Sequence, residues 1–318
     1  MSEQSVVAVE QRGALRRGGN RRPASLGRPR GEMWWAYLLI APTALGLGLF
    51  TIWPAFQTFY FSFTTWGAFG GHTWSGLTNY IQVLHDPEFG QSLINTFIFT
   101  AMAMISVPLS IVVAALLNRR RLRGIAVYRT IYFLPVVTLP AAVALVWGML
   151  YNGDFGVVNW LLSLVGIHGP SWMSDPSTAI FALGIVAIWG SIGYNMVLFL
   201  AGMQSIPRDY YEAAELDGAG KFRQFFGITL PLLTPTTFFV TVITVINSLQ
   251  VFDLVYLMVG PTNPALQHTE TVIYLFYQKG FVEGNGGYAS ATAFVLLAII
   301  VVFTVIQFRM QKKWVHYE

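Results

Sequence analysis

Six long apolar segments constrain this sequence more than any other feature. A helix that crosses the hydrocarbon core of a bilayer needs about 20 predominantly apolar residues. Windows of that kind lie at 34–60, 93–117, 126–150, 178–203, 232–258 and 288–308, and only Arg129 and Asp253 are charged within them. The whole chain is 54% hydrophobic and 11% charged, whereas a soluble chain is about 25% charged. The sequence therefore predicts an all-α polytopic membrane protein with six transmembrane helices.

The basic residues indicate how these helices are oriented. Of the 19 lysines and arginines, all but Lys279 lie in the N-terminal arm, in the segments that follow the second, fourth and sixth windows, or, for Arg129, near the start of the third window. Basic segments beside transmembrane helices stay in the cytoplasm. We therefore expect both termini to be cytoplasmic and the loops at 61–92, 151–177 and 259–287 to face outward. Arg129 is expected to extend its charged end to the cytoplasmic boundary.

The N-terminal region divides into an arm and a first helix. Residues 1–32 are rich in Arg, Gly and Pro, which predicts a disordered basic cytoplasmic arm. The apolar segment that follows is longer than that of a cleaved signal peptide, and it contains Trp34, Trp35, Pro42 and Pro54. We interpret it as a retained span, so that residues 33–318 form one transmembrane domain.

Several kinds of chemistry are excluded by what the sequence lacks. It contains no cysteine, no Gly-x-x-x-x-Gly-Lys-Ser/Thr phosphate loop and no His-Glu-x-x-His motif. The five histidines are scattered over loops and the C-terminal tail. We expect no catalytic residue and no metal site, and the basic residues lie beside apolar segments rather than on a face suited to nucleic acid.

The segment at 205–231 has the pattern of two short helices around a glycine turn. Pro207, Asp209 and Glu212 suit the start of the first helix. Asp217-Gly218 then predicts a turn, because glycine adopts positive φ without steric cost. An aromatic face is expected on the second helix, since its phenylalanines recur at helical spacing: Phe222, Phe225 and Phe226.

This segment resembles the EAA loop of binding-protein-dependent ABC importers. That pattern is Glu-Ala-Ala, then Gly, then Ile-x-Leu-Pro, and each position is matched here. The resemblance implies the type I ABC importer permease fold, with 205–231 as the coupling loop that docks on an ATPase subunit. The candidate coupling residues are Tyr211, Glu212, Ala213, Ala214, Asp217, Gly218, Ala219, Phe222, Ile228, Leu230 and Pro231.

The resemblance also implies partners and a location. Such a permease works in a bacterial plasma membrane with a second permease, two cytoplasmic ATPases and an extracytoplasmic solute-binding protein. The partner ATPases bind ATP and magnesium, so this chain needs no cofactor. Glu212 is expected to meet a basic residue of the ATPase, while Gly218 sets the angle between the two helices.

Weaker motifs are similar to those of the maltose-type carbohydrate permeases. They include Leu134-Pro135, Trp147, the run from Tyr151 to Gly156 with Asn159, and Phe252-Asp253. The substrate class that this implies is a carbohydrate: an oligosaccharide, disaccharide, polyol or glycerol-phosphate compound.

Polar residues inside the apolar windows are candidates for a substrate pathway, because a polar group at membrane depth is costly unless it faces a cavity or a partner. Asn247, Gln250 and Asp253 are spaced by three residues, which predicts one side of a continuous helix. Tyr194 and Asn195 add an aromatic ring and an amide. Helix packing is the competing explanation for each of these five positions.

Another class of transporter fits the apolar windows as well. Six spans with a polar fifth helix are compatible with an ion-coupled secondary transporter of a small polar solute. That alternative gives the 205–231 loop no role, and we therefore favour the ATP-driven importer.

Overall fold

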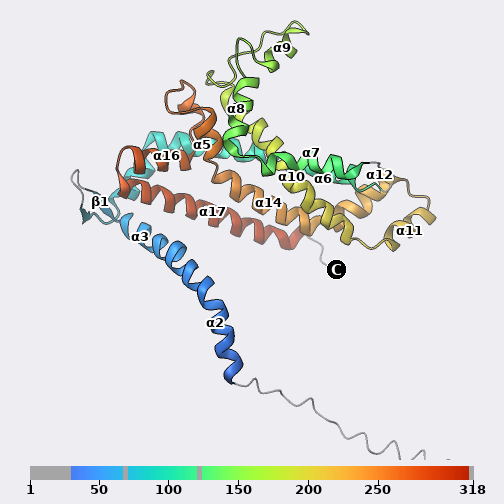
Figure 1. Cartoon of the computed structure of the whole chain (residues 1–318), viewed down its shortest axis with the longest axis horizontal. Helices are drawn as coiled ribbons and strands as arrows, with labels where there is room; N and C mark the ends of the chain where they lie inside the picture. The colour runs from blue at the N-terminus through green and yellow to red at the C-terminus, as the bar shows by residue number, and fades with distance from the viewer. Residues whose placement is uncertain (1–29, 67–70, 120–123, 315–318) are drawn as a thin grey trace, which may run out of the picture. The chain divides into compact units, whose positions relative to one another are not determined.

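The computed structural model describes residues 30–66, 71–119 and 124–314. It divides into two compact units, residues 1–56 and 57–318. The predicted arm at 1–32 lies outside the described residues except for its last three, which already belong to helix α2 (Figure 1).

Helix α2 (Arg30–Leu47) leads through a π-helical turn (Gly48–Ile52) into α3 (Trp53–Phe61). The turn has a physical cause in Pro54, which lacks an N–H and whose ring conflicts with the carbonyl four residues earlier in a regular helix. One extra residue in the turn relieves that conflict. Residues Trp34–Phe61 are long and apolar enough to cross a membrane, as the sequence predicts.

Three further helical segments meet the same criteria of length and composition: Pro87–Leu117, Ala179–Ser205 and Gly286–Lys312. Two bent helix pairs could each supply another crossing, so the described residues contain four candidate spans, or six if each pair counts as one. The predicted number of six thus requires two spans that are not straight helices.

The second span begins earlier than predicted. Asp86 caps helix α5 (Pro87–Ala103) by accepting a hydrogen bond of 2.9 Å from the Glu88 N–H, and Pro87 occupies the first turn. A short irregularity at Met104 separates α5 from α6 (Ser106–Leu117). It has a cause in Pro108, which cannot donate to the Met104 carbonyl.

The third window does not form the continuous helix predicted over 126–150. Helices α7 (Ile125–Val137) and α8 (Pro140–Leu150) meet at an angle of 101°. Leu139 has φ −59° and ψ 132°, the extended conformation that a following proline favours. The prediction failed because Pro140 interrupts the helix even though the residues on either side of it are hydrophobic.

The fifth window is interrupted twice. The segment Lys221–Leu232 meets α14 (Thr234–Leu249) at 65°, just before Pro235. Helix α14 then ends at Leu249, and α15 (Asp253–Met258) begins after a break. The hydroxyl of Thr271 donates to the Val251 carbonyl at 2.8 Å, which satisfies a backbone group freed by that break.

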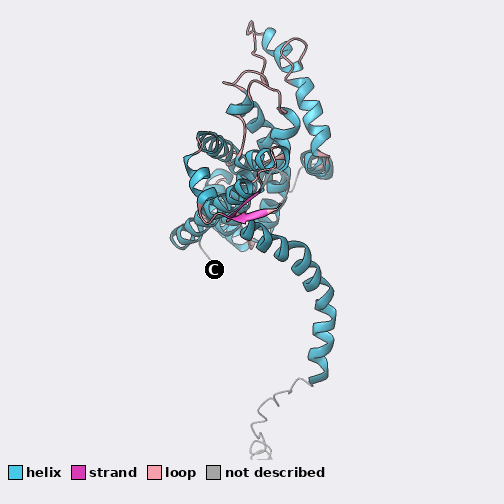
Figure 2. Ribbon diagram, turned by 90° about the vertical axis from the view of Figure 1, so that its left-hand side faces the viewer, coloured by secondary structure: helices cyan, strands magenta, loops and turns pink. Residues whose placement is uncertain are grey.

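Helix α10 (Ala179–Ser205) packs against α6 and α14 around a buried core that includes Ile111, Phe199 and Leu233. Gly193 brings α10 close to α7, since a Cβ there would collide with the Tyr132 carbonyl. A second core joins α4 (Thr78–His85), α5, α16 (Val272–Tyr277) and α17 (Gly286–Trp314). Among the described residues the only sheet is the two-stranded hairpin of β1 (Thr64–Trp66) and β2 (His72–Trp74) (Figure 2).

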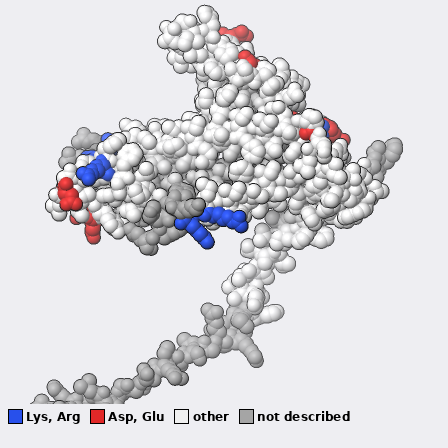
Figure 3. Space-filling model, turned by 180° about the vertical axis from the view of Figure 1, so that it is seen from behind, with Lys and Arg blue, Asp and Glu red and all other residues white. Residues whose placement is uncertain are grey.

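Short elements complete the larger unit: α9 (Val157–Ser163), α11 (Asp209–Leu216), α12 (Lys221–Gln224), a π-turn (Phe225–Thr229), α13 (Leu230–Leu232), a 3-10 turn (Leu266–His268) and a second π-turn (Gln278–Val282). Helices α11 and α12 lie at one end of this unit and α16 at the other (Figure 1). Most of the described surface on the face in Figure 3 is uncharged, and the charged side chains form small groups at the two ends, on the upper projection and at the lower edge.

Candidate functional site

The loop between α10 and α14 is built around a backbone-closed turn. Gly218 has φ +75°, a conformation in which any side chain is strained. The Ala219 N–H donates to the Ala214 carbonyl at 2.8 Å, and the Gly218 N–H donates to Glu215 at 3.0 Å. Together these bonds form a Schellman motif that ends α11. The predicted pair of helices around a Gly218 turn is therefore confirmed, although α11 starts at Asp209.

The second half of the loop is fixed to the protein core. Phe225 and Leu230 pack against the core cluster that contains Leu233. The Tyr211 hydroxyl lies 2.9 Å from the Thr229 hydroxyl, and the Gln224 amide donates to the Ala219 carbonyl at 3.0 Å. Tyr211, expected to take part in coupling, thus holds the two halves of the loop together, and sequence reasoning missed Gln224 and Thr229 because neither belongs to the motif.

Large apolar side chains of this loop are exposed. Leu216 is 90% exposed, Phe222 79% and Phe226 51%, and the rings of the two phenylalanines lie 4.8 Å apart. The predicted cluster of three phenylalanines is present, because the Phe225 and Phe226 rings lie 5.1 Å apart. Phe225 is half-buried and also packs against the core, so the exposed part of the cluster is Phe222 and Phe226. An exposed apolar group of this kind marks a surface that another molecule covers.

The other predicted coupling residues surround this apolar surface. Glu212, Ala213 and Asp217 are exposed, whereas Ala214, Ala219, Ile228, Leu230 and Pro231 are half-buried. Helix α11 is acidic, with Asp209, Glu212 and Glu215, and Lys221 and Arg223 follow in α12. Among the described residues, every ion pair within 4.0 Å involves Lys279, so Glu212 has none. The loop therefore offers unpaired charge beside an exposed apolar surface.

The polar candidates in α10 separate into two environments. Asn195 is buried, and its amide donates to the Ser106 hydroxyl of α6 at 3.2 Å, so its side chain is used between helices. Tyr194 is 42% exposed. Tyr194 thus remains available to a partner or a substrate, and Asn195 does not.

Asn247, Gln250 and Asp253 do not share one helical face. Gln250 follows the last residue of α14 and has φ −107°, and Asp253 is the first residue of α15. The prediction failed because it assumed an unbroken helix. All three side chains are exposed, so they remain candidates as separate surface groups.

Asn159 organises the loop after α8. Its amide donates to the carbonyls of Gly153 and Pro170 at 2.9 and 3.1 Å, and its oxygen accepts from the Trp172 indole at 2.7 Å. Trp172 also packs near the buried Tyr151. The run from Tyr151 to Asn159 that the sequence singled out therefore forms one structured loop.

The described helices have the length and the apolar composition of membrane-spanning segments. A model of the family described as "Binding-protein-dependent transport system inner membrane component" matches residues 106–316. The chain belongs to this family, and it is a multi-pass membrane protein of a permease class whose members are not themselves enzymes.

Two relatives align over most of the chain. The "Probable ABC transporter permease protein YesP" of Bacillus subtilis is 36% identical over 293 residues, which cover 89% of this chain and 92% of YesP. The "sn-glycerol-3-phosphate transport system permease protein UgpA" of Agrobacterium fabrum is 36% identical over 284 residues, which cover 88% of this chain and 96% of UgpA. The similarity therefore extends over more than nine tenths of the length of both relatives.

A solved structure shares the fold. A chain of a bacterial ABC transporter "involved in the import of the acidic polysaccharide alginate" superposes with a TM-score of 0.80 and 22% identity, covering 89% of this chain and 96% of that one. The fold is that of type I ABC importer permeases, as predicted.

Proposed function

We propose that this chain is the permease subunit of an ATP-driven importer that carries a carbohydrate across a bacterial plasma membrane. The observation that supports this proposal most is the 205–231 loop, in which the exposed side chains of Leu216 and Phe222 lie on either side of the turn at Gly218. Its chemistry suits docking to another protein, because exposed apolar side chains gain from burial and the surrounding charges select the partner.

The proposed partner at this loop is a cytoplasmic ATPase subunit. Two such subunits bind ATP and magnesium, and a second permease completes the pathway through the membrane. Both termini and the coupling loop then lie in the cytoplasm. Closure of the ATPases moves the loop, and Phe225 and Leu230 pass that movement to the core shared by α10 and α14. Alternating access follows from the resulting rotation of the helices.

The substrate class is proposed from the relatives. UgpA is named for sn-glycerol-3-phosphate, and one solved relative was crystallised with an "alginate pentasaccharide-bound periplasmic protein". The exposed Tyr194, Asn247, Gln250 and Asp253 are the proposed pathway groups, since an aromatic ring and polar side chains recognise a sugar's apolar face and hydroxyls. The ion-coupled alternative is not retained, because the family's transport systems depend on a binding protein.

The test measures ATP hydrolysis stimulated by loaded binding protein in the reconstituted complex. Gly218→Val should reduce stimulation at least tenfold, because valine is strained at φ +75°. Gly220→Val is the matched control, since Gly220 has φ −66° and ψ 162° and open space around it. Glu212→Lys should also uncouple the complex.

Co-purification of the ATPase and membrane insertion are measured in parallel. Stimulation and uptake that remain normal in both Gly218→Val and Glu212→Lys would refute the coupling role of the loop.

A further inference from the structure

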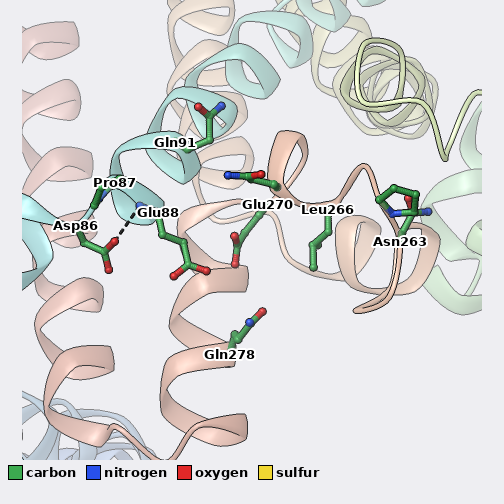
Figure 4. Close-up of a pocket in the computed structure, with 10 residues that line it drawn as sticks. Asp86, Pro87, Glu88, Gln91, Asn263, Leu266, Glu270 and Gln278 are labelled. Carbon is green, nitrogen blue, oxygen red and sulfur yellow. Dashed lines mark hydrogen bonds between the residues drawn. The ribbon is translucent and has the colours of Figure 1, made fainter.

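A polar pocket of about 760 Å³ lies at the end of the larger unit away from the coupling loop. Its lining comes from the start of α5, from the segment between α15 and α16, and from the residue that follows α16 (Figure 4). It includes Glu88, Gln91, Gln267, Glu270 and Gln278. Neither the coupling loop nor the proposed pathway groups contribute to it, so its chemistry is separate from theirs.

Glu270 is the unusual residue of this pocket. It is 4% exposed, and its Oε1 atom has no hydrogen-bond partner. Its carboxylate is directed into the space between Glu88 and Gln278 (Figure 4). A buried carboxylate without a partner is costly, which indicates that a group with hydrogen-bond donors completes the site.

The neighbouring carboxylates already have partners, unlike Glu270. Asp86 accepts from the Glu88 N–H at 2.9 Å and from the Tyr288 hydroxyl at 2.6 Å. Glu88 and Glu283 are paired with Lys279 at 2.8 and 3.1 Å. These groups leave an excess of negative charge around Glu270.

Hydrogen bonds hold the pocket in shape. The Asn95 amide donates to the carbonyls of Gln267 and Glu270, both at 3.0 Å. Its oxygen accepts from the Gln91 amide at 2.9 Å, so Gln91 is tied to the same network. The pocket therefore presents a buried carboxylate, that of Glu270, in a segment fixed by hydrogen bonds.

We propose that this pocket binds one cationic group, an ammonium or a guanidinium, with Glu270 as its counter-ion. A neutral hydroxyl could donate a hydrogen bond to Glu270 but would leave the buried negative charge unbalanced. A cation supplies both the donors and the opposite charge. The excess of carboxylates repels an anion. A metal ion fits less well, since no group of three or more His, Cys, Asp or Glu among the described residues is arranged to hold one.

The same cationic group can come from a free organic cation or from a lysine or arginine of a docking protein. The position of the pocket on the outer side rests on the proposed function, but its chemistry does not. Burial, with a smaller contribution from Glu88, raises the pKa of Glu270 to about 7, while Lys279 opposes the rise. Glu283, Asp86 and the nearby Tyr274 are the other groups that interact electrostatically with Glu270.

The first experiment titrates methylguanidinium into the purified transporter complex in nanodiscs by calorimetry, without ATP or transport substrate. Affinity should fall about tenfold from pH 8 to pH 6, since a carboxyl of pKa about 7 loses its charge over that range. Proton release on binding near pH 7, read from buffers of different ionisation enthalpy, tests the same point on the unaltered protein. Tetramethylammonium, which has no N–H donor, should bind at least tenfold more weakly.

Glu270→Gln should weaken binding at least tenfold and remove the pH dependence. Glu283→Gln removes the same charge nearby but does not line the pocket, and it should change affinity less than twofold. Methylguanidinium binding by Glu270→Gln at wild-type strength, or binding without proton release by the unaltered complex, would overturn the proposal.

A second arm identifies the source of the cation. Competition by methylguanidinium against binding-protein-stimulated ATP hydrolysis, in wild type but not in Glu270→Gln, assigns it to a docking protein; methylguanidinium binding without competition assigns it to a free cation. Because the calorimetric assay contains no ATP, failure of the proposed transport function leaves its result intact.

Discussion

The two ends of the larger unit expose and bury opposite kinds of side chain. The coupling loop has its polar backbone groups bonded at the turn and exposes apolar side chains, among them Leu216 and Phe222. The pocket at the other end buries a carboxylate, that of Glu270, without a partner. The first region gains free energy when a surface covers it, and the second gains when a charged group enters it. A permease can thus have two docking chemistries that respond to different conditions.

The largest effect is expected in the stability of the pocket end. The pKa of Glu270 is raised from 4.5 to about 7, so ionisation of this carboxyl favours the unfolded state. The free energy of unfolding therefore falls as the pH rises from 4.5 to about 7. The difference is up to about 3 kcal/mol. Thermal unfolding in detergent should show Glu270→Gln stabilised at pH 8 relative to wild type and nearly equal at pH 4.5. Equal unfolding midpoints of Glu270→Gln and the wild type at pH 8 would mean that the carboxylate is not buried in solution.

A smaller effect is expected for the apolar surface of the coupling loop. Leu216→Ala should weaken association with the ATPase by about 1 to 2 kcal/mol, since a fully buried leucine contributes on this scale. The unfolding midpoint should not change, because Leu216 is 90% exposed. Leu164→Ala, at an exposed leucine after α9, is the control and should leave association unaltered. Equal affinities for the two variants would remove Leu216 from the docking surface.

Within the loop, Tyr211→Phe isolates one hydrogen bond. Loss of the contact with the Thr229 hydroxyl should destabilise the loop by about 1 kcal/mol. Hydrogen exchange of the α11 amides is the sensitive measurement, and it should increase in this variant. Unchanged exchange in Tyr211→Phe would show that the core contacts of Phe225 alone hold the loop.

The smallest effect concerns the helix pair between the two ends. Asn195→Ala should cost about 0.6 kcal/mol of stability, the average for hydrogen bonds between membrane helices. Asn247→Ala should not alter stability, because that side chain is exposed, but it should reduce uptake if it lines the pathway. A stability loss that is larger for Asn247→Ala than for Asn195→Ala would contradict this assignment.

The sequence was sufficient for the parts of this molecule that local chemistry determines. The apolar windows located all the candidate spans, and Asp217-Gly218 predicted the turn, because hydrophobic length and glycine φ are local properties. The break at Leu139 was missed because the apolar residues on both sides outweighed Pro140 in the prediction. The break at Gln250 was missed because it is stabilised by a hydrogen bond from Thr271 to Val251, which the sequence does not reveal. Glu270 could not be recognised either, because its burial depends on segments far away in the chain, such as α5, whose Asn95 bonds the Glu270 backbone carbonyl.

Because of the Schellman turn at Gly218, the affinity of the loop for a partner and the angle between its two helices depend on different interactions. The bonds that close this turn join backbone atoms only, and no ionisable side chain takes part. Salt and pH screen or neutralise the acids of α11, so they change the strength of docking. The angle presented by the two helices is insensitive to both, and coupling should therefore weaken with ionic strength without losing its stoichiometry.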